Sequence, residues 1–277
     1  MKNSKHFDGD AFAFYKQVCS KKQDAGLVAR LLGMDAQINE LFDAYDQHFT
    51  TNTLEAMNAY GYIDSQKADL KELYDYDSAT LQKLKNELTT TNSGRVVKCQ
   101  NCTINDVNTF DHLVPQGDFT EFIVHPRNLL CCCSDCNSRR SNQWKSPNGQ
   151  RTTLNLYLDI LPTVQYLFVT ADVGNTAIET HFYLNNQNGI DATLYTLIEN
   201  HYLRLNLFKR FNDGADTVIS SLRSIMEPLR NFHDLAETKQ ILLESIRKEQ
   251  IAFGTNYWQV VLKLELLNSD DFMIEYE

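Results

Sequence analysis

The stretch that decides the fold lies between residues 99 and 137. It contains, in order, Cys99-Gln-Asn-Cys102, Asp111-His112-Leu-Val-Pro115, Asn128-Leu129 and Cys133-Ser-Asp-Cys136-Asn137. Two Cys-x-x-Cys pairs therefore enclose an Asp-His pair, and an asparagine directly follows the last cysteine. We expect this pattern to form a small, metal-stabilised module around a polar site.

The four cysteines of the two pairs predict a structural zinc site. They have the two-plus-two spacing of a tetrahedral site in which each pair contributes two thiolates. A module of about 50 residues buries too little apolar surface to be stable alone. Zinc binding, worth roughly 10–16 kcal/mol in small zinc modules, offsets that deficit. The alternatives are buried cysteines without metal, or a site in which Cys131 or Cys132 replaces Cys133. We expect Cys131 and Cys132 to act as small apolar residues that enter a strand.

Asp111, His112 and Asn137 are the residue types that phosphodiester hydrolysis requires. Neutral imidazole can take a proton from water near pH 7, so His112 is the candidate general base. Oxygen ligands suit a hard divalent ion, and the Asp111 carboxylate and the Asn137 amide supply them. Neighbouring residues of a strand point to opposite faces, so a twist or bulge is needed for Asp111 and His112 to reach one phosphate.

This set of residues resembles the HNH endonuclease family, whose module is the ββα-metal fold. The resemblance covers roughly residues 95–145, and the segments DHLVPQ and CSDCNSRRSN also resemble the HNH domain of CRISPR effector nucleases, with cysteines added. It implies that His112 is the general base and that Asn128 pins the loop carrying this histidine. It also implies that Asp111 and Asn137 hold the catalytic ion. Asn137 replaces the family's final histidine, which favours Mg²⁺ or Mn²⁺ over softer metals.

Three basic residues close to the motif are candidate nucleic-acid contacts. Arg140 follows Asn137 by three residues and would share its helix face, so we expect it to contact phosphate, with a solvated arginine as the alternative. Arg139 and Lys145 are further phosphate contacts or simply solvated charges. Trp144 is expected to pack in the core.

The distribution of charge supports a nucleic-acid partner for the motif region. The chain has a net charge of −10, yet residues 91–151 carry seven basic and five acidic residues and are its one basic segment. Phosphate binding favours such an excess. An acidic remainder would suppress indiscriminate binding to DNA.

Composition describes an ordinary globular protein in a reducing compartment. The chain has 277 residues, 43% of them hydrophobic, and no apolar run near the roughly 20 residues that cross a bilayer. The start, Met-Lys-Asn-Ser-Lys-His, lacks an apolar signal region. We therefore expect no membrane partner, a cytoplasmic location, and cysteines that bind metal rather than forming disulfides.

Hydrophobic periodicity predicts an α+β fold in three regions. Residues 1–90 are predicted to be helical, residues 91–151 to form the HNH module, and residues 152–277 to be mostly helical with a β-hairpin near 165–184. The polar run 89–94 is a predicted linker, and Gly174-Asn175 a predicted turn. In the module we expect a short hairpin carrying the Asp-His pair, then a helix capped by Ser134 or Asp135.

The sequence thus predicts a metal-dependent DNA endonuclease, a hydrolase of bacterial antiviral defence or restriction. One alternative is a zinc-stapled nucleic-acid-binding module without catalysis. Another, motivated by the large acidic helical flanks, is a nuclease subunit that is active only with a protein partner such as an ATPase. In its organisation alone, an HNH module embedded in helices, the chain resembles HNH subunits of Septu-like defence systems. No helix rich in Arg, Asn and Gln identifies a sequence-reading element.

Overall fold

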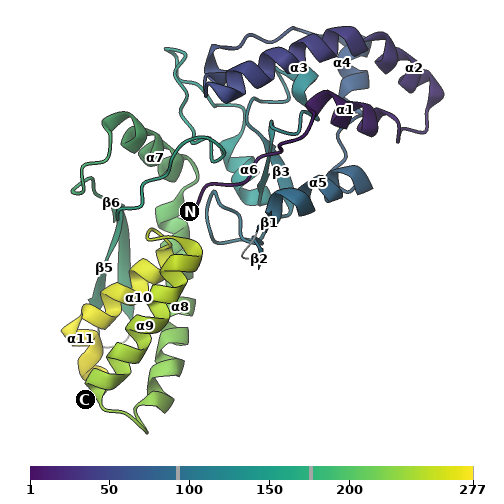
Figure 1. Ribbon diagram of the computed structural model, residues 1–277. Coiled ribbons are helices and arrows are strands. Elements are labelled where there is room, and N and C mark those ends of the chain that lie inside the picture. The colour runs from purple at the N-terminus through teal and green to yellow at the C-terminus, as the bar shows by residue number, and fades with distance from the viewer. Residues whose placement is uncertain (92–93, 175–176, 277) are drawn as a thin grey trace. The chain divides into compact units, whose positions relative to one another are not determined.

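The computed structural model describes residues 1–91, 94–174 and 177–276 (Figure 1). Contacts divide the chain into two units. The N-terminal unit comprises Asn3–Asn101 and Asn105–Ile160, and the C-terminal unit comprises Leu161–Glu277 with Met1–Lys2 and Cys102–Ile104. Helices stand beside short antiparallel strand pairs in the chain, so the predicted α+β class is confirmed at this level.

Helices dominate the first part of the N-terminal unit, as the periodicity predicts. They are α1(Ala11–Cys19), α2(Ala25–Gly33), α3(Asp35–Thr50), α4(Asp64–Lys71) and α5(Ala79–Thr89), with a 3-10 turn η1(Leu54–Ala56). The Asp10, Asp24 and Ser78 side chains accept hydrogen bonds from the first-turn amides of α1, α2 and α5, which explains where these helices begin. One face of α3 is buried, and the residues that it buries are Ile38, Phe42, Tyr45 and Phe49.

The motif region of this unit contains two short antiparallel pairs, and the second carries the Asp-His pair. The elements of this region are β1(Thr90–Thr91), β2(Gly94–Arg95), β3(Thr109–His112), the 3-10 turn η2(Thr120–Phe122), β4(Leu129–Cys132) and α6(Ser134–Arg140). Strand β1 pairs with β2, and β3 pairs with β4 in a regular register through His112, which lies opposite Leu129. Of the two expected features, a twist or a bulge, the bulge is therefore absent from this register, and His112 is the last residue of β3. Residues 92–93 of the predicted linker lie outside the described residues.

The cap of α6 differs from the expected one. Cys133, rather than Ser134 or Asp135, is the N-cap residue, and its Sγ accepts a hydrogen bond from the Cys136 amide at 3.5 Å. The reason is that the side chain of the first cysteine in a Cys-x-x-Cys pair can lie over the open amides of the first turn. The same sulfur thus serves the helix and the cysteine cluster.

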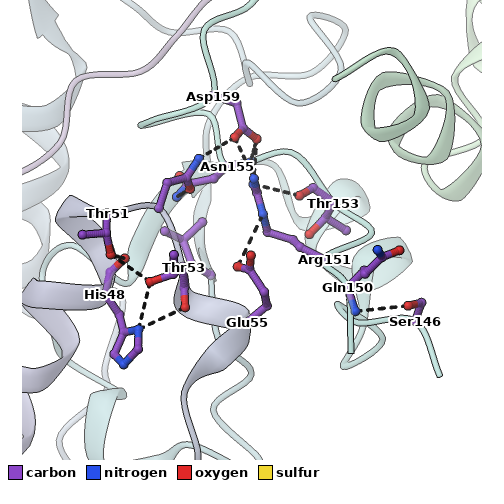
Figure 2. A network of polar contacts seen from close by, with 12 residues as sticks. His48, Thr51, Thr53, Glu55, Ser146, Gln150, Arg151, Thr153, Asn155 and Asp159 are labelled. Atoms are coloured by element: carbon purple, nitrogen blue, oxygen red, sulfur yellow. Dashed lines mark hydrogen bonds and ion pairs between the residues drawn. The ribbon is translucent and has the colours of Figure 1, made fainter. Parts of the chain in front are cut away.

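Polar contacts fix the chain that follows α6, although residues 141–160 form only turns and bridges (Figure 2). The Arg151 guanidinium forms two hydrogen bonds to the Asp159 carboxylate, at 2.6 and 2.7 Å. Asn52, just beyond α3, donates to the same carboxylate at 2.8 Å. Arg151 also donates to the backbone oxygen of Thr153 at 3.2 Å. These contacts tie residues 151–159 to the end of α3.

The C-terminal unit is a β-hairpin covered by helices (Figure 1). Its elements are β5(Leu167–Val173), β6(Ile178–Leu184), α7(Ala192–Arg204), α8(Leu207–Leu229), α9(Leu235–Phe253), α10(Trp258–Asn268), α11(Asp270–Met273) and a 3-10 turn η3(Ile274–Tyr276). Helix α8 packs on β6, and α10 packs on β5, α8 and α9. Phe182, Phe211 and Trp258 form the aromatic centre, in which the last two rings are stacked 5.3 Å apart.

The hairpin predicted near residues 165–184 is confirmed, because β5 and β6 pair antiparallel from Leu167–Leu184 to Val173–Ile178. Asn175 of the predicted turn lies outside the described residues. Within the described ranges, every helix is too short or too polar to cross a membrane.

Phe182 and Phe232 offer a matched test of the C-terminal core. Phe182 is 1% exposed and Phe232 is 83% exposed. We predict that Phe182→Ala lowers the free energy of unfolding by about 3–5 kcal/mol, because it leaves a cavity in the core. Phe232→Ala should change it by less than about 0.5 kcal/mol. Urea unfolding followed by circular dichroism measures both, and equal effects would contradict this packing.

Candidate active site

Four cysteine sulfurs gather into one buried cluster. The Sγ atoms of Cys99, Cys102, Cys133 and Cys136 lie within 4.8 Å of one another, and all four residues are at most 1% exposed. Tetrahedral zinc with Zn–S bonds of about 2.3 Å places its sulfurs about 3.8 Å apart, so this donor set fits a structural zinc ion. The Ile104 amide donates to the Cys102 sulfur at 3.4 Å, a contact that orients the ligand.

Cys131 and Cys132 lie in β4 and are not part of this cluster. Burial raises the pKa of the Cys131 thiol to about 12 and that of Cys132 well above its usual value. Both side chains therefore remain neutral thiols, as expected for small apolar residues of a strand. The cluster includes Cys133, as the preferred interpretation requires.

A cavity of about 300 Å³ lies next to α6 and brings together three of the predicted site residues. Asp111 and His112 reach it from the end of β3, and Asn137 reaches it from α6. The remaining lining residues are Pro115, Gln116, Ser134, Ser138, Ser141 and Asn142. Among the described residues, the lining therefore holds one carboxylate, one imidazole and several neutral polar groups, but neither lysine nor arginine.

The contacts of His112 determine which ring nitrogen can act as a base. Its Nε2 lies 2.9 Å from the backbone oxygen of Ile123. A carbonyl oxygen only accepts, so Nε2 carries the hydrogen and the lone pair of the neutral ring is on Nδ1. Burial lowers the pKa of His112 below its usual value, although the contact with Ile123 acts in the opposite direction. The ring also packs against Tyr74, with centroids 5.1 Å apart.

Asp111 is held by an arginine from α6. The Arg140 Nη1 donates to the Asp111 Oδ2 at 2.6 Å, and both side chains are less than a tenth exposed. Arg140 also donates to the backbone oxygens of His112 and Leu113, at 3.3 and 3.2 Å. The residue expected to contact phosphate thus lies in the interior, directed at the carboxylate.

Asn128 lies outside the cavity and binds the loop that follows His112. It is fully buried, and its Oδ1 accepts from the Val114 amide at 2.8 Å. Its Nδ2 donates to the backbone oxygens of Phe122 and Val114, at 3.0 and 3.3 Å. The Tyr45 hydroxyl of α3 donates to Oδ1 at 3.2 Å. This geometry is that of a residue that pins the loop.

The oxygen of the Asn137 side chain is the second candidate ligand. The Nδ2 atom of Asn137 donates a weak hydrogen bond to the backbone oxygen of Phe110, at 3.4 Å. This contact shows that the Nδ2 end of the amide faces Phe110. The other end is Oδ1, the atom that can bind a cation. Arg139 and Lys145 contribute nothing to the lining: Arg139 pairs with Asp135 at 2.9 Å, and the Lys145 ammonium lies 4.5 Å from the Trp144 ring centre.

Sequence reasoning missed Thr153 next to the site, and it gave Ser141 only a position four residues beyond Asn137, with no role. The Thr153 hydroxyl accepts from Arg140 Nη2 at 3.2 Å, and no spacing rule connects residues 140 and 153 across an irregular segment. Ser141 lines the cavity with φ of +48°, in a region that L-residues rarely adopt. Its ψ of −155° also differs from the left-handed conformation in which helices commonly end, so the sequence gives no signal for this backbone.

Comparison with known proteins finds similarity to a phage protein. The chain is 25% identical over 187 residues to Protein ea31 of Escherichia phage lambda. The match covers 63% of this chain and 63% of that protein, so less than two thirds of the relative is matched. No family model matches the chain, and no solved structure matches it. The candidate function therefore rests on the site itself.

The cysteine cluster predicts one tightly held zinc ion per chain. Cys136→Ala should abolish zinc binding and lower the melting temperature, because three sulfurs do not complete the zinc site and the module loses the stability that zinc binding supplies. Cys132→Ala is the matched control, since Cys132 is equally buried but outside the cluster. Metal analysis and thermal unfolding of both variants provide the measurement; zinc retained by Cys136→Ala would contradict the assignment.

Asn128 provides a test of the loop that positions His112. Asn128→Asp keeps the size of the side chain but replaces the two N–H donors with an acceptor facing the Phe122 and Val114 oxygens. We predict a loss of about 2–4 kcal/mol in the free energy of unfolding, because buried acceptors then face each other unpaired. Chemical denaturation measures it. A loss below about 0.5 kcal/mol, typical of exposed positions, would show that the loop does not depend on this side chain.

Proposed function

We propose that this chain is a metal-dependent endonuclease of the HNH type that hydrolyses phosphodiester bonds in DNA. The observation that carries the proposal is the convergence of Asp111, His112 and Asn137 on one cavity. These residues come from a strand end and from a helix whose cap belongs to a four-cysteine cluster. Asn128 binds the intervening loop, so each residue of the motif has a place consistent with its expected role.

His112 is the proposed general base. The lone pair on Nδ1 accepts a proton from water as its oxygen attacks phosphorus, and the bond from phosphorus to the 3′ oxygen breaks. The products are a 5′-phosphate and a 3′-hydroxyl that takes its proton from solvent. Because burial lowers the pKa of His112, the ring is neutral and ready to accept a proton near pH 7.

Asp111 and Asn137 are the proposed ligands of a magnesium or manganese ion. Such an ion, when bound, supplies the positive charge that offsets the charge building up on the phosphate and leaving oxygen. The donor set fits this role because it consists of one carboxylate and one amide oxygen, which hard cations prefer. The described residues that line the cavity include neither lysine nor arginine, so no side chain among them would replace this charge.

The clearest experiment is the digestion of supercoiled plasmid with Mg²⁺ or Mn²⁺. His112→Asn keeps a polar side chain at the cavity but lacks a basic nitrogen. We predict that it lowers the cleavage rate by about 100-fold or more, the usual contribution of a general base. His233→Asn is the control, because His233 lies on the surface of the C-terminal unit and pairs with Glu237.

Equal cleavage by wild-type protein and His112→Asn, both loaded with zinc, would refute the catalytic role of His112. Plasmid that is bound but never cut, with or without divalent ions, would favour the non-catalytic nucleic-acid-binding module. Cleavage that appears only after addition of a candidate ATPase would support a nuclease subunit of a larger defence assembly. Omitting Mg²⁺ and Mn²⁺ should stop cleavage while zinc stays bound.

A further inference from the structure

The buried side chain of Arg140 has a role that goes beyond the motif. We propose that Arg140 is a positioning residue that holds one oxygen of Asp111, so that the other oxygen is presented to the divalent ion. This inference rests on the proposed function, because it concerns the same metal site. It replaces the phosphate contact that the sequence suggested for Arg140.

The contacts of Arg140 are those of a clamp rather than of a substrate-binding arginine. Its guanidinium is buried and donates to four acceptors: Asp111 Oδ2, the backbone oxygens of His112 and Leu113, and the Thr153 hydroxyl. Three of these acceptors are successive residues at the end of β3. The planar fork of an arginine can satisfy several acceptors in fixed directions, which a lysine cannot.

The clamp is itself supported from behind. Thr153 accepts from Arg140 through its hydroxyl and from Arg151 through its backbone oxygen. Arg151 is in turn fixed by Asp159, as Figure 2 shows. Arg140 therefore cannot swing toward the cavity without breaking its contact with a threonine that the network holds. Metal ligands are commonly oriented by such outer partners.

Charge alone does not explain this arrangement. The formal charges of Asp111 and Arg140 cancel, and the other groups lining the cavity are neutral when His112 is neutral. A divalent ion thus gains little from net charge, so the direction of the Asp111 oxygens has to determine how well it binds. Arg140→Lys separates the two effects, because it keeps the charge but cannot reach all four acceptors.

The experiment is a titration of zinc-loaded protein with Mn²⁺ alone, followed by electron paramagnetic resonance of the free ion. We expect Arg140→Lys to weaken Mn²⁺ binding by roughly 10-fold or more, the usual effect of removing an outer partner of a metal ligand. Arg30→Lys is the control, since Arg30, although more exposed than Arg140, also pairs with an aspartate, Asp69, at 2.7 Å, and neither residue lines the cavity. Zinc content and melting temperature report whether each variant is folded.

Thr153→Val is the second variant, because it removes one acceptor of Arg140 without changing any charge. It should weaken Mn²⁺ binding by a smaller factor, about three-fold. If Arg140→Lys loses its zinc, this variant decides the question. Mn²⁺ affinity within about two-fold of wild type, in folded Arg140→Lys or in Thr153→Val, would overturn the positioning role.

Two outcomes separate the role of Arg140 from the existence of the metal site. Wild-type protein that binds Mn²⁺ and cuts plasmid, with both properties unchanged in Arg140→Lys, contradicts only the role of Arg140. Wild-type protein that binds no Mn²⁺ beside its zinc contradicts the metal site and, with it, both proposals.

Discussion

Helix α6 depends on contacts at both of its ends, and the candidate site depends on α6. The helix has seven residues, whereas isolated helices shorter than about 12–15 residues are marginal in water. At its N-terminus, the sulfurs of Cys133 and Cys136 join the four-cysteine cluster. At its C-terminus, Arg140 is bonded to the end of β3. Asn137 lies between these two anchors, so its place beside Asp111 follows from them.

Buried polar groups define the rest of the site. Asn128 uses its amide to hold the loop after His112, and Arg140 uses its guanidinium to hold Asp111 and two backbone oxygens. A buried polar group is tolerated only when its partners are present, because an unpaired one in the interior is unfavourable by about 1–3 kcal/mol. Such networks therefore favour a single arrangement of the loop and strand. That rigidity suits a site whose residues must meet within hydrogen-bonding distance.

Several features of the fold could be predicted because they depend on local pattern. The helices of residues 11–89 and the hairpin of residues 167–184 follow from apolar periodicity and β-branched content. Asn137 and Arg140 both contact residues of β3, as a spacing of three residues on one helix allows. The buried pair of Arg140 with Asp111 was not expected, because helix geometry gives the face of a residue but not what packs against that face. A carboxylate at the end of β3 attracts the guanidinium inward.

By itself, the sequence determined which residue types meet: two Cys-x-x-Cys pairs whose sulfurs form one cluster, and an Asp-His pair that lines a cavity with Asn137. Only the tertiary structure decided the partners of these residues. Tyr45 reaches Asn128 from 83 positions away, and Thr153 reaches Arg140 from an irregular segment held by Arg151 and Asp159. Spacing along the chain carries no information about such contacts, because they depend on how distant segments pack and on which buried polar groups need a partner.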